Sequence, residues 1–109
     1  MADDWIVVAN VSDVDEDDTY PVDVEGRNVC LFNLGGEIFA TEGKCTHGDA
    51  DLSQGMVVDS CLIECPLHEG TFDIRTGRAV GAPCTEDLRR YPVKVDQGVI
   101  YLSRLVEAP

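Results

Sequence analysis

The apolar residues of this chain recur in short alternating runs, and no stretch of ten or more residues has a helical period. Glycine, proline, asparagine and aspartate bound the runs, and these residues favour turns. The 109 residues leave room for one modest core. We therefore expect an all-β fold and a single domain over residues 1–109.

Both faces of segment 28–34, NVCLFNL, are apolar, so this strand should be central in its sheet. Segments 20–24 and 91–95 each contain a proline, which lacks a backbone donor and favours edge strands. Further strands are expected at 5–9, 37–41 and 99–102, and a loop is expected through residues 81–83.

The middle of the chain breaks this strand pattern. Its only two histidines lie beside cysteines, in CTH from Cys45 to His47 and in CPLH from Cys65 to His68. The 17 residues 48–64 separate the two motifs. Two thiolates and two imidazoles presented by two loops are a set of four metal ligands.

Zinc and iron–sulfur clusters both accept sulfur and nitrogen donors. Zinc fingers usually separate like ligands, as Cys-x2–4-Cys and His-x3–5-His. Here each motif pairs unlike ligands, which suits a 2Fe-2S cluster with one iron held by two cysteines and the other by two histidines. A zinc-stabilised interaction module is the alternative from a different functional class.

Three segments, CTHGDADLSQG, ECPLHEGTFDIRTGRAVGAP and YPVKVDQGVIYL, resemble the Rieske-type ferredoxins of bacterial aromatic-ring-hydroxylating dioxygenase systems. The resemblance extends over residues 5–102. It implies a small antiparallel β-sandwich with an inserted Rieske cluster-binding subdomain at approximately 42–84. Pro83 would then lie in a loop that covers the cluster from a third side.

By the same resemblance, one Rieske 2Fe-2S cluster binds per chain. Cys45 and Cys65 would hold the inner iron, and His47 and His68 would hold the outer iron near the surface.

The resemblance also implies a one-electron carrier between a flavin-dependent ferredoxin reductase and a terminal aromatic-ring dioxygenase, with transient docking and a monomeric state. We expect no substrate chemistry of its own, since an oxygenase iron site needs two further histidines. A Rieske-like small subunit of a larger reductase is a further alternative.

The reduction potential is expected to be low. High-potential Rieske proteins carry a disulfide where this chain has Ala50 and Leu67, and two hydroxyl donors where it has Gly70 and Phe72. Glu69 adds a negative charge near the cluster. We expect a value of about −150 mV, the low end of the Rieske range.

Electron transfer would pass through the edges of His47 and His68. Pro66, Leu67 and Pro83 would form an apolar docking rim, or alternatively only pack the loops.

The chain carries 21 acidic and 8 basic residues, a net charge of −13. This balance disfavours nucleic acid and anionic membranes, and it favours basic protein partners. No apolar run approaches the roughly 18 residues of a membrane span, and the start, MADDWIVVAN, lacks a basic signal region. Five cysteines without a secretion signal disfavour a disulfide scaffold, so we expect a cytoplasmic protein.

Three cysteines and two charged segments lie outside the two motifs. Cys30 is expected to be a small buried hydrophobe and Cys61 a strand residue, whereas the role of Cys84, near the proposed cluster, is open. The acidic run 12–18 is expected to be a solvated loop. The pair Arg89-Arg90 is a local basic exception that could contact an acidic patch on a partner.

Overall fold

The computed structural model describes residues 5–46, 50–66, 70–82 and 86–103. Its described residues form ten strands in three antiparallel sheets, and their helices are two 3-10 turns of three residues each, η2 (Val11–Asp13) and η3 (Leu52–Gln54). The expected all-β fold is thereby confirmed. No helix in the described ranges is long and apolar enough to cross a membrane.

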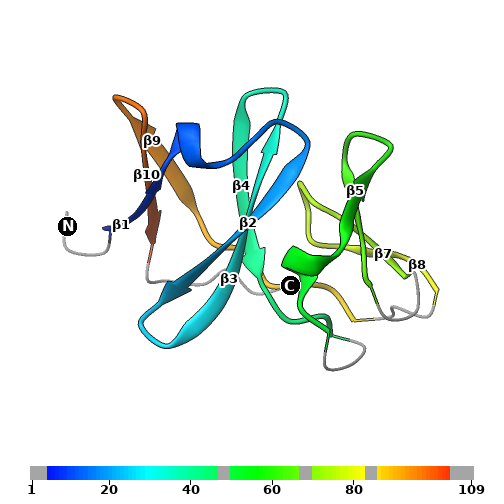
Figure 1. The fold of residues 1–109 in the computed structure, drawn as a ribbon. Helices are drawn as coiled ribbons and strands as arrows, with labels where there is room; N and C mark the ends of the chain where they lie inside the picture. The colour runs from blue at the N-terminus through cyan, green and yellow to red at the C-terminus, as the bar shows by residue number, and fades with distance from the viewer. Residues whose placement is uncertain (1–4, 47–49, 67–69, 83–85, 104–109) are drawn as a thin grey trace.

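The three sheets follow one another along the molecule (Figure 1). The first sheet has the order β1 (Trp5–Asn10), β10 (Val99–Ser103), β9 (Val93–Asp96). The second has the order β2 (Asp18–Val24), β3 (Arg27–Leu34), β4 (Glu37–Glu42). The third has the order β5 (Met56–Val58), β6 (Leu62–Glu64), β7 (Thr71–Asp73), β8 (Ala79–Gly81).

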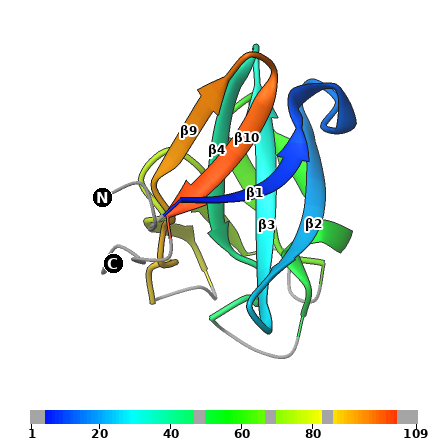
Figure 2. The same ribbon diagram turned by 90° about the vertical axis from the view of Figure 1, so that its left-hand side faces the viewer.

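Strand β3 lies between two hydrophobic cores, because alternate residues of a strand face opposite sides of its sheet. Val29 and Leu31 belong to the core shared with the first sheet, which packs in front of β2, β3 and β4 (Figure 2). Cys30 and Phe32 belong to the core shared with the third sheet. All four side chains are fully buried, so the expected central position of segment 28–34 is confirmed.

The two proline-containing segments are edge strands, as predicted. Pro21 lies in β2, at one edge of the second sheet, and Pro92 directly precedes β9, at one edge of the first. The antiparallel pairing of all three sheets agrees with the expected sandwich.

Two local predictions were wrong. Cys61 is not a strand residue but closes the turn between β5 and β6, where its N–H donates to the carbonyl of Val58 (3.3 Å). The turn is formed by Asp59 and Ser60 at φ of 52° and 62°, a conformation that short polar residues tolerate, and it lacks the glycine that usually marks a turn. The loop expected from residue 81 begins later, because Gly81 ends β8.

Segment 88–92 connects the third sheet to the second. The N–H of Leu88 donates to the carbonyl of Gly77 (2.7 Å), in the β7–β8 turn, and the N–H of Tyr91 donates to the carbonyl of Ala40 (3.0 Å), in β4. Each end of the segment is thus bound to a different sheet, which fixes the third sheet against the sandwich.

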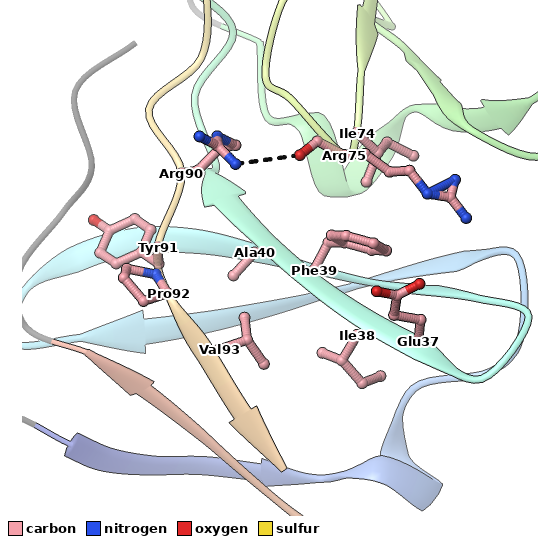
Figure 3. A pocket seen from close by; sticks show the side chains of 10 residues that line it. All are labelled: Glu37, Ile38, Phe39, Ala40, Ile74, Arg75, Arg90, Tyr91, Pro92 and Val93. Atoms are coloured by element: carbon pink, nitrogen blue, oxygen red, sulfur yellow. Dashed lines mark hydrogen bonds between the residues drawn. The ribbon is translucent and has the colours of Figure 1, made fainter.

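Side chains strengthen the same junction. The Arg90 guanidinium donates to the carbonyl of Arg75 (3.3 Å), and the Arg75 guanidinium lies over the Phe39 ring, 5.4 Å from its centre (Figure 3). These groups line a cavity of about 240 Å³ between β4, the turn after β7 and the segment that leads into β9.

Candidate metal centre

Two six-residue segments, 45–50 and 65–70, have their ends joined in the same way. Residues 45–50 are closed at their base by the antiparallel bridge between Lys44 and Asp51, and residues 65–70 by the pair Glu64 and Thr71. A cysteine is the first residue of each loop. The same hydrogen bond closes both, from Cys45 N–H to the Ala50 carbonyl (2.9 Å) and from Cys65 N–H to the Gly70 carbonyl (2.7 Å).

Both cysteines are buried in one hydrophobic core. Cys45 is 1% exposed and Cys65 is 2% exposed, and they share a cluster of buried residues with Ile63 and Phe72 of the third sheet. Neither is in a disulfide. Two buried cysteines that the backbone holds at equivalent positions match the sulfur half of the predicted ligand set.

The first loop is fixed from both sides. On its C-terminal side, the Asp51 carboxylate accepts hydrogen bonds from the backbone N–H of Ser53 (3.0 Å) and from its hydroxyl (2.7 Å), which caps η3. Within the loop, the Thr46 hydroxyl donates to the carbonyl of Glu86, 40 residues later in the chain (2.6 Å).

Residues that flank positions 83–85 are bonded to one another and to the first loop. The Ala79 N–H donates to the Asp87 carboxylate (2.9 Å), so residues on both sides of positions 83–85 are tied together, and the Thr46–Glu86 bond joins them to the first loop. Pro83 itself lies outside the described residues, so its place on a third side of the site stays a prediction.

Several predicted residues lie outside the described residues: His47, His68, Leu67, Glu69, Pro83 and Cys84. Pro66, at the start of the second loop, is exposed, as a docking rim requires. Within the described ranges, no three His, Cys, Asp or Glu side chains form a group that could hold a metal. Of the four predicted ligands, only the two cysteines fall in these ranges.

Cys30 has a different environment from the candidate ligands. It is fully buried in the core, and burial raises the pKa of its thiol from 9.0 to about 12. A thiol with this pKa stays protonated at neutral pH and is a poor metal ligand. Its predicted role as a buried hydrophobe is confirmed.

A comparison with protein-family models matches residues 4–92 to the Rieske 2Fe-2S domain. The chain belongs to this family. Its cofactor is accordingly a 2Fe-2S cluster of the Rieske type, which the paired loops and the Cys/His donor set fit.

Two relatives match this Rieske domain over nearly their whole length. It is 44% identical over 103 residues to the ferredoxin component of the naphthalene 1,2-dioxygenase/salicylate 5-hydroxylase systems of Ralstonia sp., covering 94% of this chain and 98% of the relative. It is 39% identical over 98 residues to the 3-phenylpropionate/cinnamic acid dioxygenase ferredoxin subunit of Escherichia coli (strain K12), covering 90% and 92%.

Among solved structures, the chain is similar to one from a complex of reduced oxygenase and oxidized ferredoxin in carbazole 1,9a-dioxygenase. The TM-score is 0.90 with 34% identity, and the match covers 97% of this chain and 98% of the other. The names of these three proteins carry different aromatic compounds.

The surroundings of the site are apolar where high-potential Rieske proteins have polar groups. Ala50 and Gly70 are buried at the ends of the two loops, and Phe72 is fully buried in β7. None of these three residues has a side-chain hydrogen-bond donor.

Sequence reasoning missed residues that shape the loops without binding metal. Thr46 and Asp51 position the first loop through the hydrogen bonds above, and Lys44 pairs with Asp51 at its base. A signal was present for Asp51, because Asp-x-Ser is a common capping pattern. The contact of Thr46 with Glu86 had no signal, since it joins distant parts of the chain.

Proposed function

We propose that this protein is the ferredoxin component of a multicomponent aromatic-ring dioxygenase, a one-electron carrier with no substrate chemistry of its own. The observation that carries the proposal is the pair of loops closed in the same way, each beginning with a buried cysteine, in a chain of the Rieske family. The two relatives compared by sequence above are named as ferredoxin components, and the match covers nearly their whole length.

The proposed cluster-binding region is approximately residues 42–84. Cys45 and Cys65 would hold one iron of the cluster, because both are almost fully buried and neither is in a disulfide. His47 and His68 would hold the other iron. When bound, the cluster supplies a single redox equivalent, at a potential that its Cys/His ligation raises above that of all-cysteine ferredoxins.

The residues of this chain have two tasks in electron transfer. The buried core around the cysteines excludes water from one side of the site. Fewer water molecules then have to reorient when an electron is transferred. Exposed Pro66, with Leu67 and Pro83, forms the apolar rim on which partners dock.

The proposed partners are the terminal oxygenase and a flavin-dependent ferredoxin reductase. A complex of oxygenase with ferredoxin exists for the carbazole system, which supports the first. The carrier acts as a monomer, since transient electron-transfer interfaces are small. It acts in the cytoplasm, where cysteine thiols stay reduced, and none of the four cysteines of the described ranges is in a disulfide.

The test is reconstituted turnover with the reductase and oxygenase of its own system. Oxygenase turnover driven by NAD(P)H should require this protein in catalytic amounts and should stop when Cys65→Ser replaces it. Turnover that proceeds equally without the protein, or equally with Cys65→Ser, would reject the carrier role.

A further inference from the structure

Basic side chains gather at one place on this acidic protein. Three of its eight Lys and Arg residues, Arg27, Lys44 and Arg89, line a single cleft of about 470 Å³, together with Asn28, Glu42 and Tyr91. We call this set of six residues the basic cleft. Arg27, Lys44 and Arg89 are all exposed.

The backbone of the basic cleft is fixed. The N–H of Glu42 donates to the carbonyl of Arg89 (2.9 Å), and the N–H of Arg89 donates to the Glu42 carboxylate (2.8 Å). The N–H of Gly43 donates to the carbonyl of Asn28 (2.8 Å), and a Cβ at Gly43 would lie 2.7 Å from the Asn28 side chain. Strand β3, the end of β4 and segment 88–92 thus meet at fixed positions.

The carboxylate of the cleft already has a partner. Among the described residues that line the cleft, Glu42 is the acidic one and accepts the Arg89 N–H, so this lining carries more positive than negative charge. Guanidinium and ammonium groups bind carboxylates through charge-assisted hydrogen bonds. The cleft therefore fits an anionic group from outside the chain.

The cleft also borders the first cluster loop. Lys44 and Asn28 line both the cleft and a smaller depression whose other walls are Ala50 and Asp51. Ala50 is the last residue of the loop that begins with Cys45. A group held in the cleft is thus placed beside the loop through which the proposed carrier exchanges electrons.

We propose that the basic cleft receives aspartate or glutamate side chains of a protein redox partner and so sets the orientation of the docked complex. The inference rests on the proposed function. An overall charge of −13 attracts a basic partner surface in many orientations, whereas one basic site beside the cluster loop favours a single orientation.

The test compares two double variants with the same net charge. Arg27→Gln with Arg89→Gln removes two cations of the cleft and keeps the backbone bonds of Arg89. Lys94→Gln with Arg78→Gln removes two exposed cations elsewhere, Lys94 lying over the rings of Trp5 and Tyr101. Both pairs change the net charge from −13 to −15, by the loss of two positive charges.

The readout is the KM for the ferredoxin in reductase and oxygenase assays at low and high salt, with the visible spectrum as a check that the cluster is intact. The cleft variant should raise the KM with at least one partner by about fivefold or more at low salt, and less at high salt. The control should leave the KM unchanged or lower it, because a more acidic carrier is attracted more strongly to a basic partner. Arg27→Lys with Arg89→Lys should restore most of the affinity.

An unchanged or lower KM for the cleft variant with both partners would overturn the proposal while leaving the carrier role intact. Wild-type protein that supports no turnover would instead reject the proposed function itself. Carbodiimide cross-linking of the wild-type complex is a second test that needs no variant to fold. It should join Lys44 to a partner carboxylate, and cross-links formed only through carboxylates of this chain would also overturn the proposal.

Discussion

The sandwich of the first two sheets and the third sheet are stabilised in different ways. Strand β3 has eight residues, and the core between the first two sheets is made of aliphatic side chains and Tyr91. All four strands of the third sheet have three residues, and the core beneath them includes Cys45 and Cys65. Such short strands are marginal alone, so we expect the third sheet to depend on the metal centre more than the sandwich does.

The largest effect should come from the buried cysteines themselves. Cys65→Ser should abolish the visible absorption and the bound iron, because the loop loses a thiolate that water or serine cannot replace. Cys30→Ala is the matched control, since Cys30 is equally buried but its thiol stays protonated. Iron analysis should find two irons in this control, and loss of iron there would show that Cys30 also binds the cluster.

Removal of the metal should destabilise the third sheet more than the sandwich. After treatment with a chelator, backbone amides of the third sheet should exchange hydrogen at rates within about tenfold of those of an unstructured chain. The amides of β3 and β10 should remain protected. Hydrogen exchange followed by mass spectrometry measures both in one sample. Equal loss of protection in β3 and in the third sheet would mean that the cluster stabilises the whole domain.

Two buried isoleucines test the same difference in the apoprotein. Ile100 in the first sheet and Ile63 in the third are both fully buried. Ile100→Ala should lower the free energy of unfolding by about 2–5 kcal/mol. Ile63→Ala should change it by less than about 1 kcal/mol, because its surroundings are already unfolded without metal. Urea denaturation gives both free energies of unfolding. Similar losses for the two variants would contradict the expected difference between the sandwich and the third sheet.

The smallest effect concerns the apolar surroundings of the cluster. Phe72→Tyr should raise the reduction potential by about 40–90 mV, which corresponds to a hydrogen bond of about 1–2 kcal/mol that favours the reduced state. Phe39→Tyr, beneath Arg75, is the control and should leave the potential unchanged. Voltammetry measures both, and an unchanged value for Phe72→Tyr would remove the proposed cause of the low potential.

The sequence predicted the sandwich better than the third sheet, for a physical reason. A strand such as 28–34 is long enough to show which of its faces are buried, so its central position was predictable. The three-residue strands of the third sheet are too short for a period, and Asp59 and Ser60 form a turn without glycine. Cys61 was therefore placed wrongly.

At the site, the pairing of cysteine with histidine identified the chemistry, but not the equivalence of the loops. That equivalence depends on the pairs Lys44–Asp51 and Glu64–Thr71, which join residues with no shared pattern. The basic cleft was only partly foreseen, through Arg89. Arg27 and Lys44 join it because β3, β4 and segment 88–92 meet there in the fold.

The most direct test of the central claim is the iron, sulfide and zinc content of the anaerobically purified protein, followed by its EPR spectrum after reduction with dithionite. We predict two irons and two sulfides per chain, as in one 2Fe-2S cluster, and a rhombic signal with the low average g of mixed Cys/His ligation. A colourless protein with one zinc and no signal after cluster reconstitution would contradict the account.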